Sequence, residues 1–188
     1  MRARVLFSLA FCAAGALVTG CASAPSGEEI KTTFDAGLKD YDAGDYRAAY
    51  DKWRSIDQFD LAALRNVALM LRKGEGVPKD PKAAEALMAE AADAGLATAQ
   101  ADLADMLIKG EAGPPDPKAA VPWLARAASA GHPLAAFELA RMYEEGTVVK
   151  QDIEQARKLY KLAAAAGVDG AQDRLKALPP EPDPPLRH

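Results

Sequence analysis

The sequence predicts an all-α fold, a right-handed α-solenoid of stacked antiparallel helical hairpins. Residue types recur 36 positions apart through most of the chain, and the apolar residues within each interval follow helical spacing. Ala is abundant, whereas aromatic residues make up only 6% of the chain. Because Ala loses no side-chain entropy in a helix and lets backbones approach closely, this composition favours packed helices over sheets.

The repeat is visible as columns of like residues in one register. These columns include Gly74, Gly110 and Gly146; Asp80, Asp116 and Asp152; Gly95, Gly131 and Gly167; and Met70, Met106 and Met142. So many columns in one register indicate a true repeat, and they define three complete units at residues 61–96, 97–132 and 133–168. Because one hairpin cannot cover its own apolar face, stacking several in register is expected to bury a continuous core.

Residues 1–20 are typical of a secretory signal peptide. Arg2 and Arg4 give a basic start, and the uncharged apolar run over residues 5–18 is shorter than the roughly 20 residues of a membrane-spanning helix. The ending Val18-Thr19-Gly20-Cys21 resembles the lipobox of bacterial lipoproteins. The resemblance implies cleavage before Cys21 and lipidation of its thiol, so that the protein is attached to a membrane through lipid.

Plain secretion is the alternative, with Cys21 next to the cleavage site by chance. The small Gly20 and the loop-like tether over residues 21–27 favour the lipoprotein interpretation. By the same resemblance, Ala22 after the cysteine implies an outer-membrane lipoprotein that faces the periplasm of a Gram-negative cell. Retention in the inner membrane stays open.

Residues 28–60 predict a leading hairpin. Its first helix is expected at about residues 28–43, with an inward stripe formed by Ile30, Phe34, Leu38 and Tyr41. The following residues, Gly44-Asp45-Tyr46 with Ala49 and Trp53, resemble the turn and second helix of a tetratricopeptide-like unit.

Each complete unit predicts a helix, a loop, a second helix and a tight turn. In the third unit, the first helix spans Leu134 to Glu145 and ends at Gly146 in a left-handed conformation. Asp152 is expected to cap the second helix, with Gln155 in the capping-box position. In the second unit, Pro122 is expected to kink its helix or remove one hydrogen bond. Small residues are predicted where the two helices of each hairpin cross, at Ala68, Ala104 and Ala140.

These motifs resemble a known repeat family. The stretch Gly74-Glu75-Gly76-Val77-Pro78-Lys79-Asp80, followed by Ala91-Ala92 and Gly95, resembles the Sel-1-like repeat, a relative of the tetratricopeptide repeat. The resemblance covers about residues 41–175 and implies a protein-interaction scaffold. Residues 169–178 are predicted to form a capping helix whose Leu175 closes the stack, and residues 179–188 a Pro-rich disordered tail.

The residue inventory argues against catalysis, metal binding and cofactors. The chain has two histidines, and cleavage would leave Cys21 as its one cysteine. His132 is interpreted as a helix-entry residue and His188 as part of the tail. Thiol catalysis, zinc binding and a catalytic serine are therefore not expected. The formal net charge of −4 and the lack of a basic cluster exclude nucleic acid as a partner.

The predicted function is protein binding on the concave face, which the first helices of solenoid repeats line. The candidate residues lie off the core stripe of these helices: Arg65, Asn66, Asp102, Asp105, Phe137, Glu138 and Arg141. Phe137 is either an exposed anchor for the partner or a packing residue between neighbouring hairpins. We expect a monomer with one protein partner.

Two other functions remain open at this stage. One is an envelope regulator that responds to cell-wall fragments. The other is a peptidoglycan- or β-lactam-binding protein, because some secreted Sel-1-like proteins have been credited with binding or hydrolysing β-lactams. Those relatives resemble a cysteine-rich subset with a disulfide in each repeat, and this chain has no cysteine in its repeats.

Overall fold

The computed structural model describes residues 24–180. The predicted signal peptide, Cys21, the first part of the tether and the tail from residue 181 onward lie outside the described residues. Within the described part, no helix combines the length and the apolar character needed to cross a membrane.

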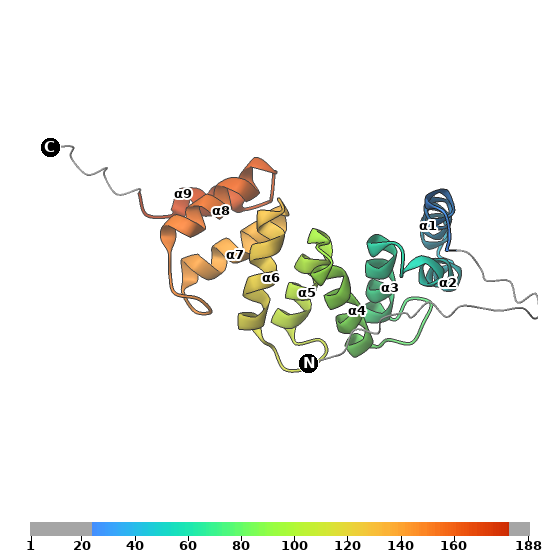
Figure 1. The fold of residues 1–188 in the computed structure, drawn as a ribbon. Helices are drawn as coiled ribbons and strands as arrows, with labels where there is room; N and C mark the ends of the chain where they lie inside the picture. Colours follow the sequence, from blue (N-terminus) through green and yellow to red (C-terminus); the bar gives the residue numbers. More distant parts are fainter. Residues whose placement is uncertain (1–23, 181–188) are drawn as a thin grey trace, which may run out of the picture.

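The described residues form nine α-helices joined by short connections (Figure 1). Eight of them make four hairpins and the ninth follows the last hairpin. Their bounds are α1 Gly27–Asp42, α2 Tyr46–Ile56, α3 Leu61–Lys73, α4 Pro81–Asp93, α5 Ala97–Lys109, α6 Pro117–Ser129, α7 Pro133–Glu145, α8 Ile153–Ala165 and α9 Ala171–Ala177.

The hairpins stack in chain order, from α1 at one end to α9 at the other (Figure 1). Each helix packs mainly against the helices before and after it in the sequence. This arrangement confirms the predicted all-α stack of hairpins. It follows from the sequence because every unit has two amphipathic helices and an apolar face that only a neighbouring unit covers.

Aspartates at 36-residue spacing start the second helices. The side chain of Asp80 accepts a hydrogen bond from the backbone N–H of Ala83, and Asp116 and Asp152 do the same three residues downstream. Each such cap is worth about 1 kcal/mol. The capping role of Asp152 is thus confirmed, whereas the reciprocal capping box is found at the start of α1, between Ser26 and Glu29.

The ends of the first helices also follow the prediction. Gly146 ends α7 with φ of 69°, and Gly74 and Gly110 end α3 and α5 in the same left-handed region. A side chain at such a position would be strained, which explains why Gly recurs there.

The core consists largely of alanines and methionines. Ala68, Ala104 and Ala140 are fully buried, and each packs in a cluster with residues of the second helix of its own hairpin, as predicted. The methionine column is core as well, with Met70, Met106 and Met142 buried. Of the two tryptophans, Trp53 is buried, while Trp123 is half-buried against two core clusters.

One local expectation needs correction, and at Pro122 the second of the two expected outcomes is found. Leu38 does not point into the core, because its side chain is 40% exposed at the edge of a cavity between α1 and α3. The reason is that α1 packs chiefly against α2, so a position on its α3-facing side stays open. At Pro122, α6 runs on without interruption, and the proline is exposed. The helix loses one hydrogen bond there but keeps its packing.

Candidate partner-binding surface

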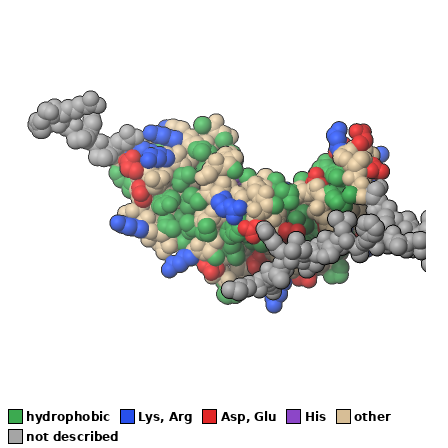
Figure 2. All heavy atoms as spheres, in the orientation of Figure 1, with side chains coloured by type: hydrophobic (Ala, Val, Ile, Leu, Met, Phe, Trp, Pro, Cys, Tyr) green, Lys and Arg blue, Asp and Glu red, His purple; other side chains and the backbone are tan. Residues whose placement is uncertain are grey.

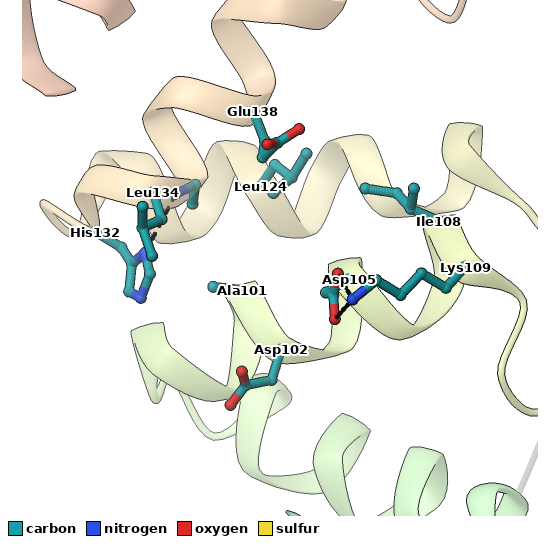
Figure 3. A pocket seen from close by; sticks show the side chains of 10 residues that line it. Ala101, Asp102, Asp105, Ile108, Lys109, Leu124, His132, Leu134 and Glu138 are labelled. Atoms are coloured by element: carbon teal, nitrogen blue, oxygen red, sulfur yellow. Dashed lines mark hydrogen bonds and ion pairs between the residues drawn. The ribbon is translucent and has the colours of Figure 1, made fainter. Parts of the chain in front are cut away.

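A cavity of about 450 Å³ lies between the first helices of the second and third units, α5 and α7 (Figure 3). Leu124 of α6 forms part of its floor. The cavity is lined by Ala101, Asp102, Asp105, Ile108, Lys109, Leu124, His132, Leu134, Ala135 and Glu138. Three of the predicted partner-binding residues, Asp102, Asp105 and Glu138, therefore meet at one place.

The cavity has an apolar interior and a charged edge. Figure 3 shows Leu124 between Glu138, which comes from α7, and the pair formed by Asp105 and Lys109 of α5. The Leu134 side chain is 60% exposed, so the apolar lining continues to the molecular surface. The lining and Leu134 thus form one apolar surface rimmed by charged side chains, as is typical of interaction sites.

The neighbouring space between α3 and α5 is closed by two arginines. Arg65 of α3 donates from Nε to the Asp102 carboxylate of α5 at 2.5 Å. Arg72 of α3 pairs with Asp105 and also with Glu111, to which its Nε donates at 2.6 Å. The bonds to Glu111 raise the pKa of Arg72 above its ordinary value, although burial opposes this.

Asp105 is likewise stabilised in its charged form by its ion-pair partners. Its partial burial raises the pKa, but hydrogen bonds from Lys109 and Arg72 outweigh this effect, so the pKa lies below the ordinary value for aspartate. Asp105 is therefore ionised over a wide pH range and bridges two units.

The repeat register explains why the next space stays open. One period after Arg65 and Arg72 stand Ala101 and Ile108, which carry no charge to span the gap between α5 and α7. Glu138 lies one period after Asp102, and among residues 24–180 its ion pair is with Arg141 of its own helix, at 3.2 Å. Two short apolar residues thus replace two bridging arginines and leave the cavity.

Replacing Arg72 with Ala is expected to lower the free energy of unfolding by about 1–2 kcal/mol, between the values for exposed and buried ion pairs. Its side chain is only 15% exposed and joins two units, so its loss leaves Asp105 and Glu111 without their shared partner. Urea unfolding measures the change. The control, Lys109→Ala, removes an exposed ion pair that lies within α5 and joins no two units, and it should change stability by less than about 0.5 kcal/mol. Equal effects of the two variants would contradict the bridging role of Arg72.

His132 starts α7 at one end of the cavity, as a helix-entry residue. Its Nδ1 accepts a hydrogen bond from the backbone N–H of Ala135 at 3.3 Å, so the neutral ring acts as the helix cap. Burial lowers the pKa of His132, partly offset by nearby Asp102, while Arg65 lowers it further. Both the cap and the burial favour the neutral form.

Stability should therefore depend on pH through His132. In the unfolded chain its pKa is about 6.5, and in the folded protein it is lower, so the unfolded state binds more protons between these values. We expect the free energy of unfolding to fall as the pH drops below about 6.5. In His132→Asn, which keeps a capping oxygen but does not titrate, this part of the decline should disappear. Superimposable pH profiles for the two proteins would contradict the assignment.

The other predicted residues lie nearby but not in this cavity. Arg65 contacts it only through Asp102, and Arg141 lies on the other side of Glu138, between that residue and Glu145. Asn66 lines a second, smaller cavity of about 160 Å³ between α1 and α3, together with Leu38, Tyr41, Trp53, Leu69, Met70, Lys73 and Glu75.

Phe137 is a packing residue rather than an exposed anchor. It is half-buried, and its ring contacts Tyr160 of α8 edge to face with centroids 5.5 Å apart. Of the two interpretations of Phe137, the structure favours packing, but within its own hairpin rather than between neighbouring hairpins, because the ring joins the cluster around Ala140 and Tyr160.

The sequence reasoning missed Leu134, Ile108, Leu124 and Lys109. The sequence does mark Ile108, because an apolar residue stands there 36 positions after the charged Arg72. No comparable signal marks Leu124, which looks like any core leucine of a second helix. Across residues 24–180 no three His, Cys, Asp or Glu side chains are grouped so that they would hold a metal ion.

The family model of the Sel1 repeat matches residues 61–96, 97–132 and 133–168, which is more than half of the 188 residues. The chain belongs to the Sel1 repeat family. Among solved structures, a Sel1 repeat protein from Oxalobacter formigenes is similar at 31% identity and a TM-score of 0.71, over 76% of this chain and 58% of that one. No curated protein sequence matches the chain.

Two further structures show the same Sel1 repeat architecture. A protective antigen of uropathogenic Escherichia coli with an SLR fold has 27% identity and a TM-score of 0.71, over 79% of this chain and 33% of that one. An immunity protein from Pseudomonas aeruginosa, at 22% identity and a TM-score of 0.54 over 81% and 59% of the two chains, shares the fold. The chain thus spans less than two thirds of these relatives. The chain is a Sel1 repeat scaffold, a class of protein whose general role is to bind other proteins.

Proposed function

We propose that this Sel1 repeat protein is a lipid-anchored scaffold on the periplasmic side of the outer membrane, which holds a protein partner and catalyses no reaction. The partner binds the surface formed by the first helices of the hairpins. The anchor is the lipid on Cys21, and residues 22–26 connect it to α1.

The open cavity between α5 and α7 carries the binding part of this proposal. It is an apolar hollow with a leucine, Leu134, exposed at its edge and with charged residues around it. An apolar centre with a polar rim is the usual anatomy of a protein-binding site. On the face seen in Figure 2, hydrophobic side chains are grouped over the half of the molecule that contains α6, α7 and α8.

Three ionisable residues of the site, Asp102, Asp105 and His132, support binding rather than catalysis. Asp102 and Asp105 are held by arginines of the neighbouring unit, and His132 caps a helix. Each therefore has a structural partner. A general acid or base instead needs a carboxylate or imidazole free to exchange a proton with a bound substrate.

The anchor is tested by labelling with a palmitate analogue in a Gram-negative host, followed by membrane fractionation. We expect label and outer-membrane location for the wild-type protein, and loss of both for Cys21→Ala. Unlabelled protein that is soluble in the periplasm would contradict the anchor and leave the binding surface to be tested by itself.

The surface is tested by photocrosslinking in intact cells. A benzophenone amino acid replaces Leu134 or Asn66 on the first helices, and in control proteins it replaces Lys118 or Lys158, which are exposed on the second helices α6 and α8. We expect adducts of a discrete mass from the first two positions only. Adducts of equal yield from all four positions, or from none, would contradict the proposed surface.

A further inference from the structure

We propose that the cavity between α5 and α7 takes an apolar side chain from a partner segment in which a lysine or arginine adjoins that side chain, and that the cation pairs with Glu138. This inference rests on the proposed function and specifies the chemistry of its partner. It follows from the way the repeat pattern is broken at this one place.

Equivalent positions in successive units differ at this cavity. Between α3 and α5, the Arg65 guanidinium reaches across to Asp102. The equivalent residues one period later are Ala101 and Glu138, which both line the cavity, so the second and third units have an alanine where the first and second have the bridging arginine. The scaffold thus keeps the acceptor of the bridge and lacks the donor.

The carboxylates of the cavity differ in how many further hydrogen bonds they accept. Asp102 is taken by Arg65, and Asp105 by both Arg72 and Lys109. Within the described part of the chain, Glu138 has one partner, Arg141 of its own helix, at 3.2 Å, and its side chain is 42% exposed. Because a carboxylate accepts about four hydrogen bonds, Glu138 has room for an incoming guanidinium or ammonium group.

An apolar interior lies beside the Glu138 carboxylate. Ala101, Ile108, Leu124 and Leu134 line about 450 Å³ of space, a volume within the usual range of ligand pockets, about 300–1,000 Å³. In Figure 3, Glu138 lies directly beside Leu124 at the side of this hollow. A partner that buries an apolar side chain here therefore brings its neighbouring residue close to Glu138.

Charge selects the class of partner. Of the three carboxylates that line the cavity, Asp102 and Asp105 are paired with arginines of α3, so it is the exposed Glu138 carboxylate that favours a basic segment over an acidic one. The whole chain has a formal net charge of −4, which opposes a second copy of this protein as the occupant. The occupant is accordingly a basic, apolar segment of a different protein.

The experiment measures the full chain, purified in detergent micelles, against immobilised peptides on a biosensor surface. The first probe is the hexapeptide Gly-Ser-Leu-Arg-Ser-Gly. The comparison peptides replace its Arg with Glu or its Leu with Ser. We expect each comparison peptide to bind at least about tenfold more weakly than the first.

A closing variant locates the site. Ala101→Arg places in α5 the residue that Arg65 provides in α3, so it should pair with Glu138, fill the cavity and leave the melting temperature unchanged or higher. Binding of the Leu-Arg peptide should be lost. The control, Gln172→Arg on the exposed surface of α9, adds the same charge away from the cavity and should bind like the wild type.

A second variant tests the ion pair without adding bulk. Glu138→Gln should reduce binding of the Leu-Arg peptide to the level of a peptide with Gln in place of Arg, while binding of that Gln peptide is unchanged. This result does not depend on whether Ala101→Arg folds.

The inference is overturned if the Leu-Arg and Leu-Glu peptides bind equally, if none binds, or if Ala101→Arg folds and binding persists. Self-association that Ala101→Arg abolishes would also overturn it, in favour of a second copy. These outcomes are distinct from failure of the scaffold itself. Crosslinks from Leu134 without peptide selectivity would keep the proposed function and reject only this partner chemistry.

Discussion

The Tyr160→Ala variant is expected to lose about 3–5 kcal/mol of unfolding free energy, the range for truncating a large buried aromatic residue. Tyr160 of α8 is completely buried and is the largest such side chain among the described residues. Its ring packs against Phe137, and its hydroxyl donates to the Glu144 carboxylate at 2.6 Å. Burial, followed by this hydrogen bond, raises the pKa of Tyr160, so the hydroxyl stays a donor.

Urea unfolding followed by circular dichroism measures this loss. The matched control is Tyr160→Phe, which keeps the ring and removes only the hydrogen bond. It should cost about 1 kcal/mol, since Glu144 retains its ion pair with Arg174. A similar loss in both variants would show that the hydroxyl, rather than ring packing, holds α7 and α8 together.

The fold was predictable because its determinants are local and repeated. Asp at the start of each second helix, Gly at the end of each first helix and Ala at each crossing recur at 36-residue spacing, and each has a structural role that depends on its own unit. Agreement between three copies of one pattern makes such a prediction strong, because an error in one unit is exposed by the other two.

The site was only partly predictable, because its shape depends on differences between units. Asp102, Asp105 and Glu138 followed from their place on the first helices, but the cavity exists because Ala101 and Ile108 replace two arginines. The pairs Arg65–Asp102 and Arg72–Asp105 are 37 and 33 residues apart, or one period plus one and one period minus three. Residues at these offsets lie on the facing sides of adjacent first helices. The pairs can be recognised only once the two helices are placed side by side.

Phe137 and Leu38 show a related limit. Helical periodicity places Leu38 on the inward stripe and Phe137 off it, whereas the structure has Leu38 exposed and Phe137 packed, because periodicity does not say which neighbour covers a face. Phe137 is covered by Tyr160 of the same hairpin, whereas Leu38 lies where α1 and α3 diverge. The difference between a core residue and a surface residue is set here by the spacing of hairpins.

Two alanines on α5 provide a direct test of this spacing. Ala104 is fully buried and packs with Ala120, Leu124 and Ala127 of α6, the partner helix of its hairpin. Ala104→Leu adds bulk where the two helices meet, so we expect it to lower the free energy of unfolding by about 1–3 kcal/mol or to prevent folding.

The same substitution one turn earlier should have the opposite effect. Ala101 faces the cavity between α5 and α7, so Ala101→Leu adds apolar contacts with Leu124 and Leu134 without displacing any packed group. We expect an unchanged or higher melting temperature, because filling an existing cavity removes apolar surface from water. Calorimetry measures the melting temperatures of the two variants, which carry the same Ala→Leu substitution at different positions of α5. If both alanines respond alike, the space between α5 and α7 is not open in solution, and the cavity is no site for a partner.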